Sequence, residues 1–106
     1  MFGDLFGNVQ QQQEEMRRKL AGITVEAESG DGAIKIKANA NREILDIAID
    51  KEKLDWEDAE QLQDLLVTAI NRVLEKAQVK EQAEANKMIQ DLMPPGMGGL
   101  AGMFGQ

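Results

Sequence analysis

The fold is decided by one stretch, residues 23–38, which has the sequence ITVEAESGDGAIKIKA. Apolar and polar residues alternate at both of its ends, and the segment SGDG at 29–32 lies between them. Alternation with a period of two is typical of a strand that buries one face, and Gly and Asp favour a turn. The stretch therefore predicts a β-hairpin with one buried side.

A loop over residues 29–32 would set the register of this hairpin. It places Glu26 opposite Lys35 and Thr24 opposite Lys37 on the polar side. Because opposite charges on facing residues attract, we expect Glu26 and Lys35 to form a cross-strand pair. Lys37 faces a neutral residue and is expected to be freer than Lys35.

A third strand is predicted over residues 43–49, after a second turn at 39–42 with the sequence NANR. The second turn lacks Gly, but Asn tolerates a positive φ better than most residues. Both sides of the strand carry apolar residues: Leu45, Ile47 and Ile49 on one, and Ile44 and Ala48 beside Asp46 on the other. We therefore expect an antiparallel meander whose last strand is partly covered on both faces.

The strongest periodic signal lies near the middle of the chain. Residues at helical spacing form a wide apolar stripe of Leu62, Leu65, Leu66, Ala69, Ile70, Val73, Leu74 and Ala77. Such a stripe predicts an amphipathic helix that packs on a sheet, and a weaker pattern extends the helix to about Leu92. The charged connection before it, residues 50–58, holds the only Trp, which we expect to plug the core or a dimer edge.

The residues before the hairpin predict a first helix that ends near Gly22. Its apolar residues form a narrow seam with one polar interruption: Phe2, Phe6, Val9, Gln13, Met16 and Leu20. The steps of four and three residues are typical of a helix that lies against another helix.

Composition excludes several classes of function. The chain has 106 residues with no Cys and no His, so disulfides, zinc fingers and imidazole bases are ruled out. The formal net charge of −7 favours basic partners and, taken alone, argues against nucleic acid. The sequence begins without the pattern of a signal peptide, and no apolar run approaches the ~18 residues of a membrane span, so we expect a cytoplasmic protein.

These elements together predict an α+β fold in the order helix, three-stranded antiparallel meander, long helix (α-β-β-β-α). We expect a single domain over residues 1–92. The sequence PPG at 94–96 ends the second helix, and residues 93–106 are predicted to be a flexible tail rich in Gly, Met and Pro.

The ordered set of elements resembles the YbaB/EbfC family of bacterial nucleoid-associated DNA-binding proteins along nearly the whole chain. The resemblance rests on MFG at 1–3, SGDGAIKI at 29–36, IAID at 47–50, LQDLLVTAIN at 62–71 and LMPPGM at 92–97. The chain departs from the family in its second turn, where members often have Gly. The resemblance implies a tweezer-like homodimer that binds DNA with little sequence preference and acts in the nucleoid.

Ten basic residues are candidates for DNA contacts, and they fall into three groups. The first helix ends with Arg17, Arg18 and Lys19. The second helix carries Arg72, Lys76, Lys80 and Lys87 within about 80° of one another, at ~100° per residue. The polar side of the sheet and its second turn carry Lys35, Lys37 and Arg42.

Each group also has a purely structural interpretation. Cations in the last turn of a helix are stabilised by the helix dipole. Glu84 and Asp91 lie at nearby angles and can form surface ion pairs with the basic residues of the second helix, and Lys80 and Glu84 have the best spacing for such a pair. Lys35 is accounted for by Glu26. Aromatic side chains for stacking on bases are not found on the polar side of the sheet.

The leading hypothesis is therefore a homodimer that binds double-stranded DNA by neutralising phosphates, with a role in nucleoid organisation and gene regulation. The alternative is a protein-interaction dimer that binds no DNA itself and uses its acidic surface on a basic partner. An enzyme is a distant third hypothesis, because the acidic residues 55–60 lie where a helix N-terminus favours acids anyway. We expect no cofactor, no metal, no small-molecule substrate and no membrane association.

Overall fold

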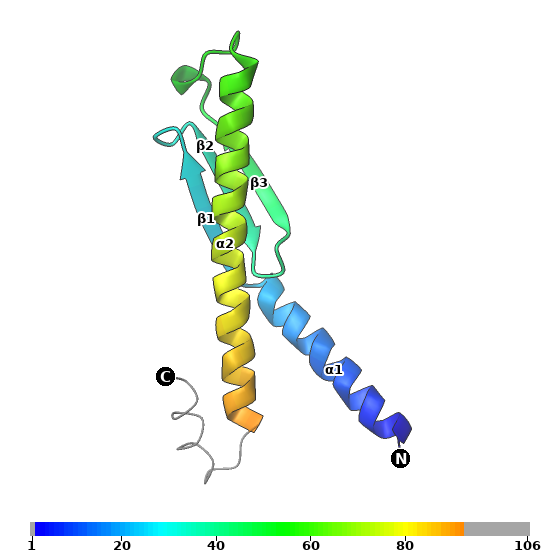
Figure 1. Cartoon of the computed structure of the whole chain (residues 1–106). Helices are drawn as coiled ribbons and strands as arrows, with labels where there is room; N and C mark the ends of the chain where they lie inside the picture. Colours follow the sequence, from blue (N-terminus) through cyan, green and yellow to red (C-terminus); the bar gives the residue numbers. More distant parts are fainter. Residues whose placement is uncertain (1, 93–106) are drawn as a thin grey trace.

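The structure is a computed structural model that describes residues 2–92 (Figure 1). Its elements are α1 (Phe2–Ala21), β1 (Thr24–Ser29), β2 (Ile34–Asn39), β3 (Ile44–Ile49), a 3-10 turn η1 (Lys51–Lys53) and α2 (Ala59–Leu92). The predicted α+β class and order of elements are confirmed. The predicted tail lies outside the described residues.

The three strands form one antiparallel sheet in the order β1-β2-β3, and α2 crosses one of its faces (Figure 1). Ile34 and Ile36 of β2 are buried against Val73 at the middle of the α2 stripe. Ala69 and Ala77 flank Val73 and are fully buried, so the helix backbone can approach the sheet closely. The predicted packing of the apolar stripe on the sheet is confirmed.

The predicted register of the first hairpin is wrong by two residues. Lys35 lies opposite Glu28, and Lys37 lies opposite Glu26. The expected pair between Glu26 and Lys35 is therefore not formed. A shift of two residues leaves every side chain on its predicted face, so the alternation of the sequence could not reveal the error.

The turn sets the true register. Ser29 belongs to the strand and is buried, and its hydroxyl donates a hydrogen bond to the backbone oxygen of Leu65 on α2 at 2.6 Å. Gly30, Asp31 and Gly32 all have positive φ, and the loop comprises residues 30–33, one position later than predicted. A Cβ at position 30 would come within 3.0 Å of the Leu65 side chain, so both the backbone and the space require Gly there.

A β-bulge changes the faces of β3. Ile44 lies opposite Ala38 and Asp46 lies opposite Lys37, which leaves Leu45 as the extra residue. Ile44 therefore joins the side of the sheet that faces α2, and its predicted place beside Asp46 is wrong. The prediction that β3 is covered also fails within one chain, because Leu45 is 50% and Ile47 is 43% exposed.

The second turn is organised by Asn39, which is buried. Its side-chain oxygen accepts hydrogen bonds from the backbone N–H groups of Asn41 at 3.0 Å and Glu43 at 3.1 Å. Its amide donates to the Glu43 carboxylate at 2.9 Å. Arg42 is the residue of this turn with a positive φ, at 64°. We expected an Asn in that conformation, but neither Asn39 nor Asn41 has a positive φ.

The two helices separate as they leave the sheet (Figure 1). A helix of 34 residues is about 51 Å long, whereas a strand of six residues covers about 20 Å, so α2 extends well beyond the sheet. Along the seam of α1, Leu20 is buried and Met16 is half-buried, but Gln13 and Val9 are exposed. Within one chain, only the C-terminal end of this seam is buried. The predicted contact with another helix is therefore not formed along the rest of the seam.

Trp56 is not part of the core, since its side chain is 54% exposed. The Lys51 ammonium lies 6.0 Å from the centre of its ring, within the range of a cation–π contact. Of the two interpretations of this residue, the core interpretation is therefore wrong.

Replacing Asn39 with Ala is expected to lower the free energy of unfolding by about 2 kcal/mol, because the backbone N–H groups of Asn41 and Glu43 lose the acceptor that holds the turn. Urea unfolding at neutral pH measures the change. Asn41→Ala is the control, because Asn41 makes a single exposed side-chain hydrogen bond, to the backbone oxygen of Arg17 at 2.7 Å. An equal loss in the two variants would contradict the role given to Asn39.

Candidate nucleic-acid interface

Three of the predicted cations meet where α1, the second turn and α2 come together. We call this place the helix junction and define it by Lys19, Arg42, Glu81, Glu84 and Lys87. Glu84 lies between two ammonium groups, with Lys19 at 2.9 Å and Lys87 at 3.3 Å. Arg42 pairs with Glu81 at 3.5 Å and thereby links the second turn to α2.

Glu84 is the central group of the helix junction and is only 9% exposed. The hydrogen bond from Lys19 lowers the pKa of its carboxyl group, as does the one from Lys87, while burial acts in the opposite direction. The same hydrogen bond raises the pKa of Lys19. Both groups therefore stay charged at neutral pH, and Glu84 neutralises part of the positive charge that the sequence places here.

Three other candidates are more available to an external anion. Arg17, Arg18 and Lys80 are exposed. Arg18 approaches Glu14 at 3.9 Å, but both side chains lie largely in solvent, where such pairs are weak. Among the described residues, the side chains of Arg17 and Lys80 have no hydrogen bond and no ion pair.

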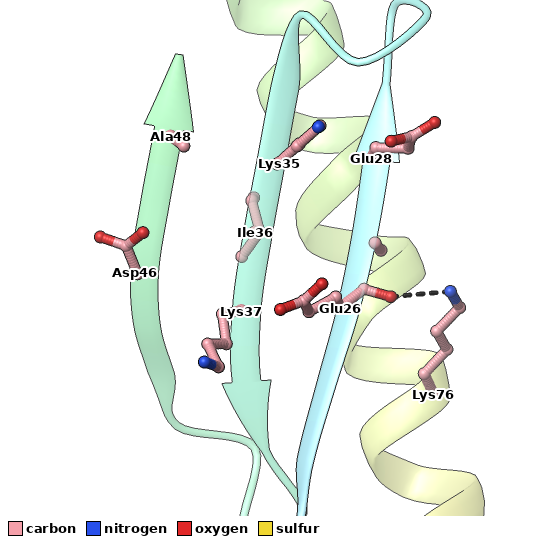
Figure 2. A pocket seen from close by; sticks show the side chains of 9 residues that line it. Glu26, Glu28, Lys35, Ile36, Lys37, Asp46, Ala48 and Lys76 are labelled. Carbon is pink, nitrogen blue, oxygen red and sulfur yellow. Dashed lines mark hydrogen bonds between the residues drawn. The ribbon is translucent and has the colours of Figure 1, made fainter.

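The basic residues predicted to form one stripe on α2 fall into two groups, which differ in whether they contact β1. Arg72 donates a hydrogen bond to the backbone oxygen of Glu28 at 2.8 Å. Lys76 donates to the backbone oxygen of Glu26 at 2.7 Å, as Figure 2 shows. All three side chains are exposed, but Arg72 and Lys76 are bound to β1, whereas Lys80 makes no hydrogen bond within the described residues. The expected ion pair of Lys80 with Glu84 is not formed.

The face of the sheet away from α2 carries charges of both signs in a shallow depression (Figure 2). Lys37 lies between Glu26 on β1 and Asp46 on β3. Lys35 lies beside Glu28 on β1. Because carboxylates alternate with the ammonium groups, this face offers little net attraction for phosphates.

Sequence reasoning located the cations and named Glu84 as a partner of the basic stripe, which its pair with Lys87 bears out, but it missed the groups that bind Lys19, Arg72 and Lys76. Glu84 and Lys87 are three residues apart on α2, so their pairing could have been read from the spacing. The partners of Lys19 and Lys76 belong to other elements, so no local sequence pattern predicts these contacts.

Two features are absent from the described part of the chain. Between residues 2 and 92, no three or more Asp, Glu, His or Cys side chains come together in a way that could hold a metal ion. Over the same residues, neither helix combines the length and the apolar character needed to cross a membrane.

Comparison with known proteins now decides the family. A model described as the YbaB/EbfC DNA-binding family matches residues 1–92. The chain belongs to the YbaB/EbfC family. The resemblance in its sequence is thereby confirmed, and the description of the family names DNA binding rather than a reaction.

Relatives within the YbaB/EbfC family match nearly end to end. A nucleoid-associated protein of Thermodesulfovibrio yellowstonii is 37% identical over 109 residues, covering 100% of this chain and 96% of the relative. One of Pelotomaculum thermopropionicum is 41% identical over 92 residues, covering 84% of this chain and 88% of the relative. The crystal structure of an uncharacterized Helicobacter pylori protein has the same fold, with a TM-score of 0.68, 24% identity, and coverage of 83% of this chain and 92% of that one.

Replacing Glu84 with Gln is expected to lower the melting temperature in a way that depends on pH. Because the pKa of Glu84 is lowered from 4.5, its pairing stabilises the folded chain above that value and is lost as pH falls through the lowered pKa. Because the pKa of Lys19 is raised from 10.5, that contribution is complete below 10.5 and is lost as pH rises through the raised value.

Thermal melts from acid to neutral pH check this expectation. The difference between wild type and Glu84→Gln should be largest near neutral pH and shrink in acid. Glu14→Gln removes the same charge from an exposed pair and serves as the control. A difference that is constant over the whole pH range would exclude the carboxylate pairing as its cause.

Proposed function

We propose that this chain is a nucleoid-associated protein that binds double-stranded DNA as a homodimer, with little sequence preference. Its membership of a DNA-binding family is the observation that carries the proposal. Relatives named nucleoid-associated proteins support a location at the nucleoid, in the cytoplasm. A role in nucleoid organisation and gene regulation is part of the proposal. Two features of the structure support the proposal: an uncovered apolar surface on β3 and a set of exposed cations beside the helix junction.

The surface for the second copy is the uncovered apolar side of β3. The helix α2 lies over β1 and β2, so the helix-facing side of β3 has little to cover it (Figure 1). Ile44, Ile47 and Ile49 are all partly exposed there. Exposed apolar residues on a sheet edge are costly for a monomer, since they invite association.

The flank of α2 continues this apolar surface. At ~100° per residue, Ile70 and Leu74 lie about 60° and 100° from Val73 on one side, and Lys76 and Arg72 lie at similar angles on the other. Since Arg72 and Lys76 contact β1, the half-buried Ile70 and Leu74 are turned towards β3. A second copy placed over β3 would bury both surfaces, and the same patch on each partner satisfies two-fold symmetry.

The exposed cations Arg17, Arg18 and Lys80 are the proposed phosphate contacts. Arg17 and Arg18 precede Lys19 on α1 and Lys80 precedes Glu81 on α2, so all three lie beside the helix junction. The two helices diverge from this end of the sheet (Figure 1). Binding would release counterions from the DNA and would carry no information on base sequence. The junction cations Lys19, Arg42 and Lys87 are held by Glu81 and Glu84 and would act mainly by positioning α1 against α2.

A second candidate function is favoured by the charge of the chain. The formal net charge is −7, and carboxylates or backbone oxygens already bind many of the cations. A homodimer that binds a basic protein and no DNA would fit this balance. The DNA titration below separates the two candidates.

Replacing Ile47 with Asp is expected to convert the dimer into a monomer, because it places a charge in the apolar surface of β3. Light scattering in high salt should give about twice 11.7 kDa for wild type and 11.7 kDa for the variant. Val79→Asp is the control, since Val79 is exposed on α2 beside β1. A wild-type monomer at micromolar concentration would refute the dimer.

Replacing Arg17, Arg18 and Lys80 with Gln is expected to weaken DNA binding strongly while leaving the thermal melt intact. For wild type, a dimer that neutralises ~4–8 phosphates should give a slope of log K against log salt of about −4 to −7. Unrelated duplexes should bind within about tenfold of one another, because no group for reading bases is proposed. Fluorescence anisotropy titrations at low and moderate salt measure both quantities.

The matched control replaces Lys35, Lys37 and Lys51 with Gln, which removes the same charge from other surfaces. If the control loses binding and the first variant keeps it, the DNA contacts lie on the sheet face rather than beside the helix junction. If wild type binds no duplex even at low salt, the DNA proposal fails and the protein-interaction candidate takes its place.

A further inference from the structure

The two edges of the sheet differ in the contacts that their outward backbone groups make. The strand order β1-β2-β3 makes β1 one edge and β3 the other. A free edge presents unpaired backbone groups on which another strand can add. On β1, the backbone oxygen of Glu26 points away from β2 and accepts a hydrogen bond from Lys76 (Figure 2). The backbone oxygen of Glu28, two residues along the same strand, accepts one from Arg72.

The spacing of these contacts is set by the two elements. Arg72 and Lys76 are four residues apart on a helix, a rise of about 6 Å, and Glu26 and Glu28 are two residues apart on a strand, a rise of about 6.7 Å. The later helix residue meets the earlier strand residue, as expected for elements that run in opposite directions. Successive basic residues on one stripe of α2 can therefore bind successive outward oxygens of β1.

The other edge has no equivalent contacts. Among the described residues, no side chain donates a hydrogen bond to the backbone of β3 (residues 44–49). Its residues are exposed along its whole length. The chain therefore occupies one edge with charged side chains and leaves the opposite edge open.

We propose that Arg72 and Lys76 are edge caps, which close β1 to strand addition and confine assembly to the β3 side. Growth at both edges would produce open chains of subunits, whereas growth at one edge stops at a closed pair. The limit of two subunits rests on the proposed dimer, but the capping of β1 does not. Under this proposal the two cations serve assembly rather than DNA.

Replacing both caps with Met, as Arg72→Met with Lys76→Met, removes the donors and keeps long unbranched side chains. We expect the average mass to rise with protein concentration above the wild-type mass, as measured by light scattering and sedimentation. The matched control is Arg17→Met with Lys80→Met, which changes the same residue types and the same charge on exposed side chains. The control should keep the wild-type mass.

A rescue variant tests whether the edge itself is responsible. Because the Glu26 oxygen points outward, its N–H group does as well, so Glu26→Pro removes a donor without breaking the β1–β2 pairing. Added to the double Met variant, it should restore the wild-type mass. Larger species that persist after this addition would exclude strand addition at β1 and overturn the proposal.

The remaining outcomes are equally decisive. A folded double Met variant that keeps the wild-type mass at all concentrations overturns the capping proposal. If the double variant does not fold by circular dichroism, the single variants Arg72→Met and Lys76→Met are measured instead, and wild-type mass in both overturns it. A wild-type monomer would refute the proposed dimer alone, since growth of the Met variant beyond wild type would still support capping.

Discussion

The packing of α2 on the first hairpin is the constraint on which the rest of the structure depends. Val73 and its neighbours Ala69 and Ala77 are fully buried against Ile34 and Ile36. Small residues on the contact line bring the helix close to β1 and β2, and a single helix is too narrow to cover a third strand as well. The same packing therefore builds the core, brings basic side chains to the β1 edge and leaves β3 exposed.

The elements could be predicted from the sequence because their signals are local. Periods of two and 3.6 residues identify strands and helices, whichever elements they pack against. The register could not be predicted in this way, since a shift of two residues keeps Val25 and Ala27 on the buried side. It depends on Ser29, whose hydroxyl bonds to Leu65, a residue 36 positions away. The bulge at Leu45 likewise arises in the pairing with β2 and leaves no periodic trace.

The candidate site could be predicted only in part, for a related reason. A helical wheel gives the direction of Arg72, Lys76 and Lys80 but not the groups they meet. Lys76 binds a backbone oxygen that lies 50 residues earlier in the chain, and backbone oxygens are the same for every sequence. Lys19 meets Glu84 only because the second turn brings the end of α1 to α2. Charge patterns thus overestimate how many cations are available to a ligand.

This loss of available cations connects DNA binding to assembly. With Arg72 and Lys76 bound to β1 and the helix junction neutralised by Glu81 and Glu84, few cations without a partner remain for phosphates among the described residues of one chain. Affinity for a duplex rises with the number of phosphates neutralised, so one chain with a net charge of −7 is expected to bind a duplex weakly. In the proposed dimer, two sets of Arg17, Arg18 and Lys80 are held on one rigid body, and the second set binds without a new loss of translational freedom. Under the proposed function, an acidic chain of this kind therefore needs its β3 surface in order to bind DNA, even though no residue of β3 would touch the duplex.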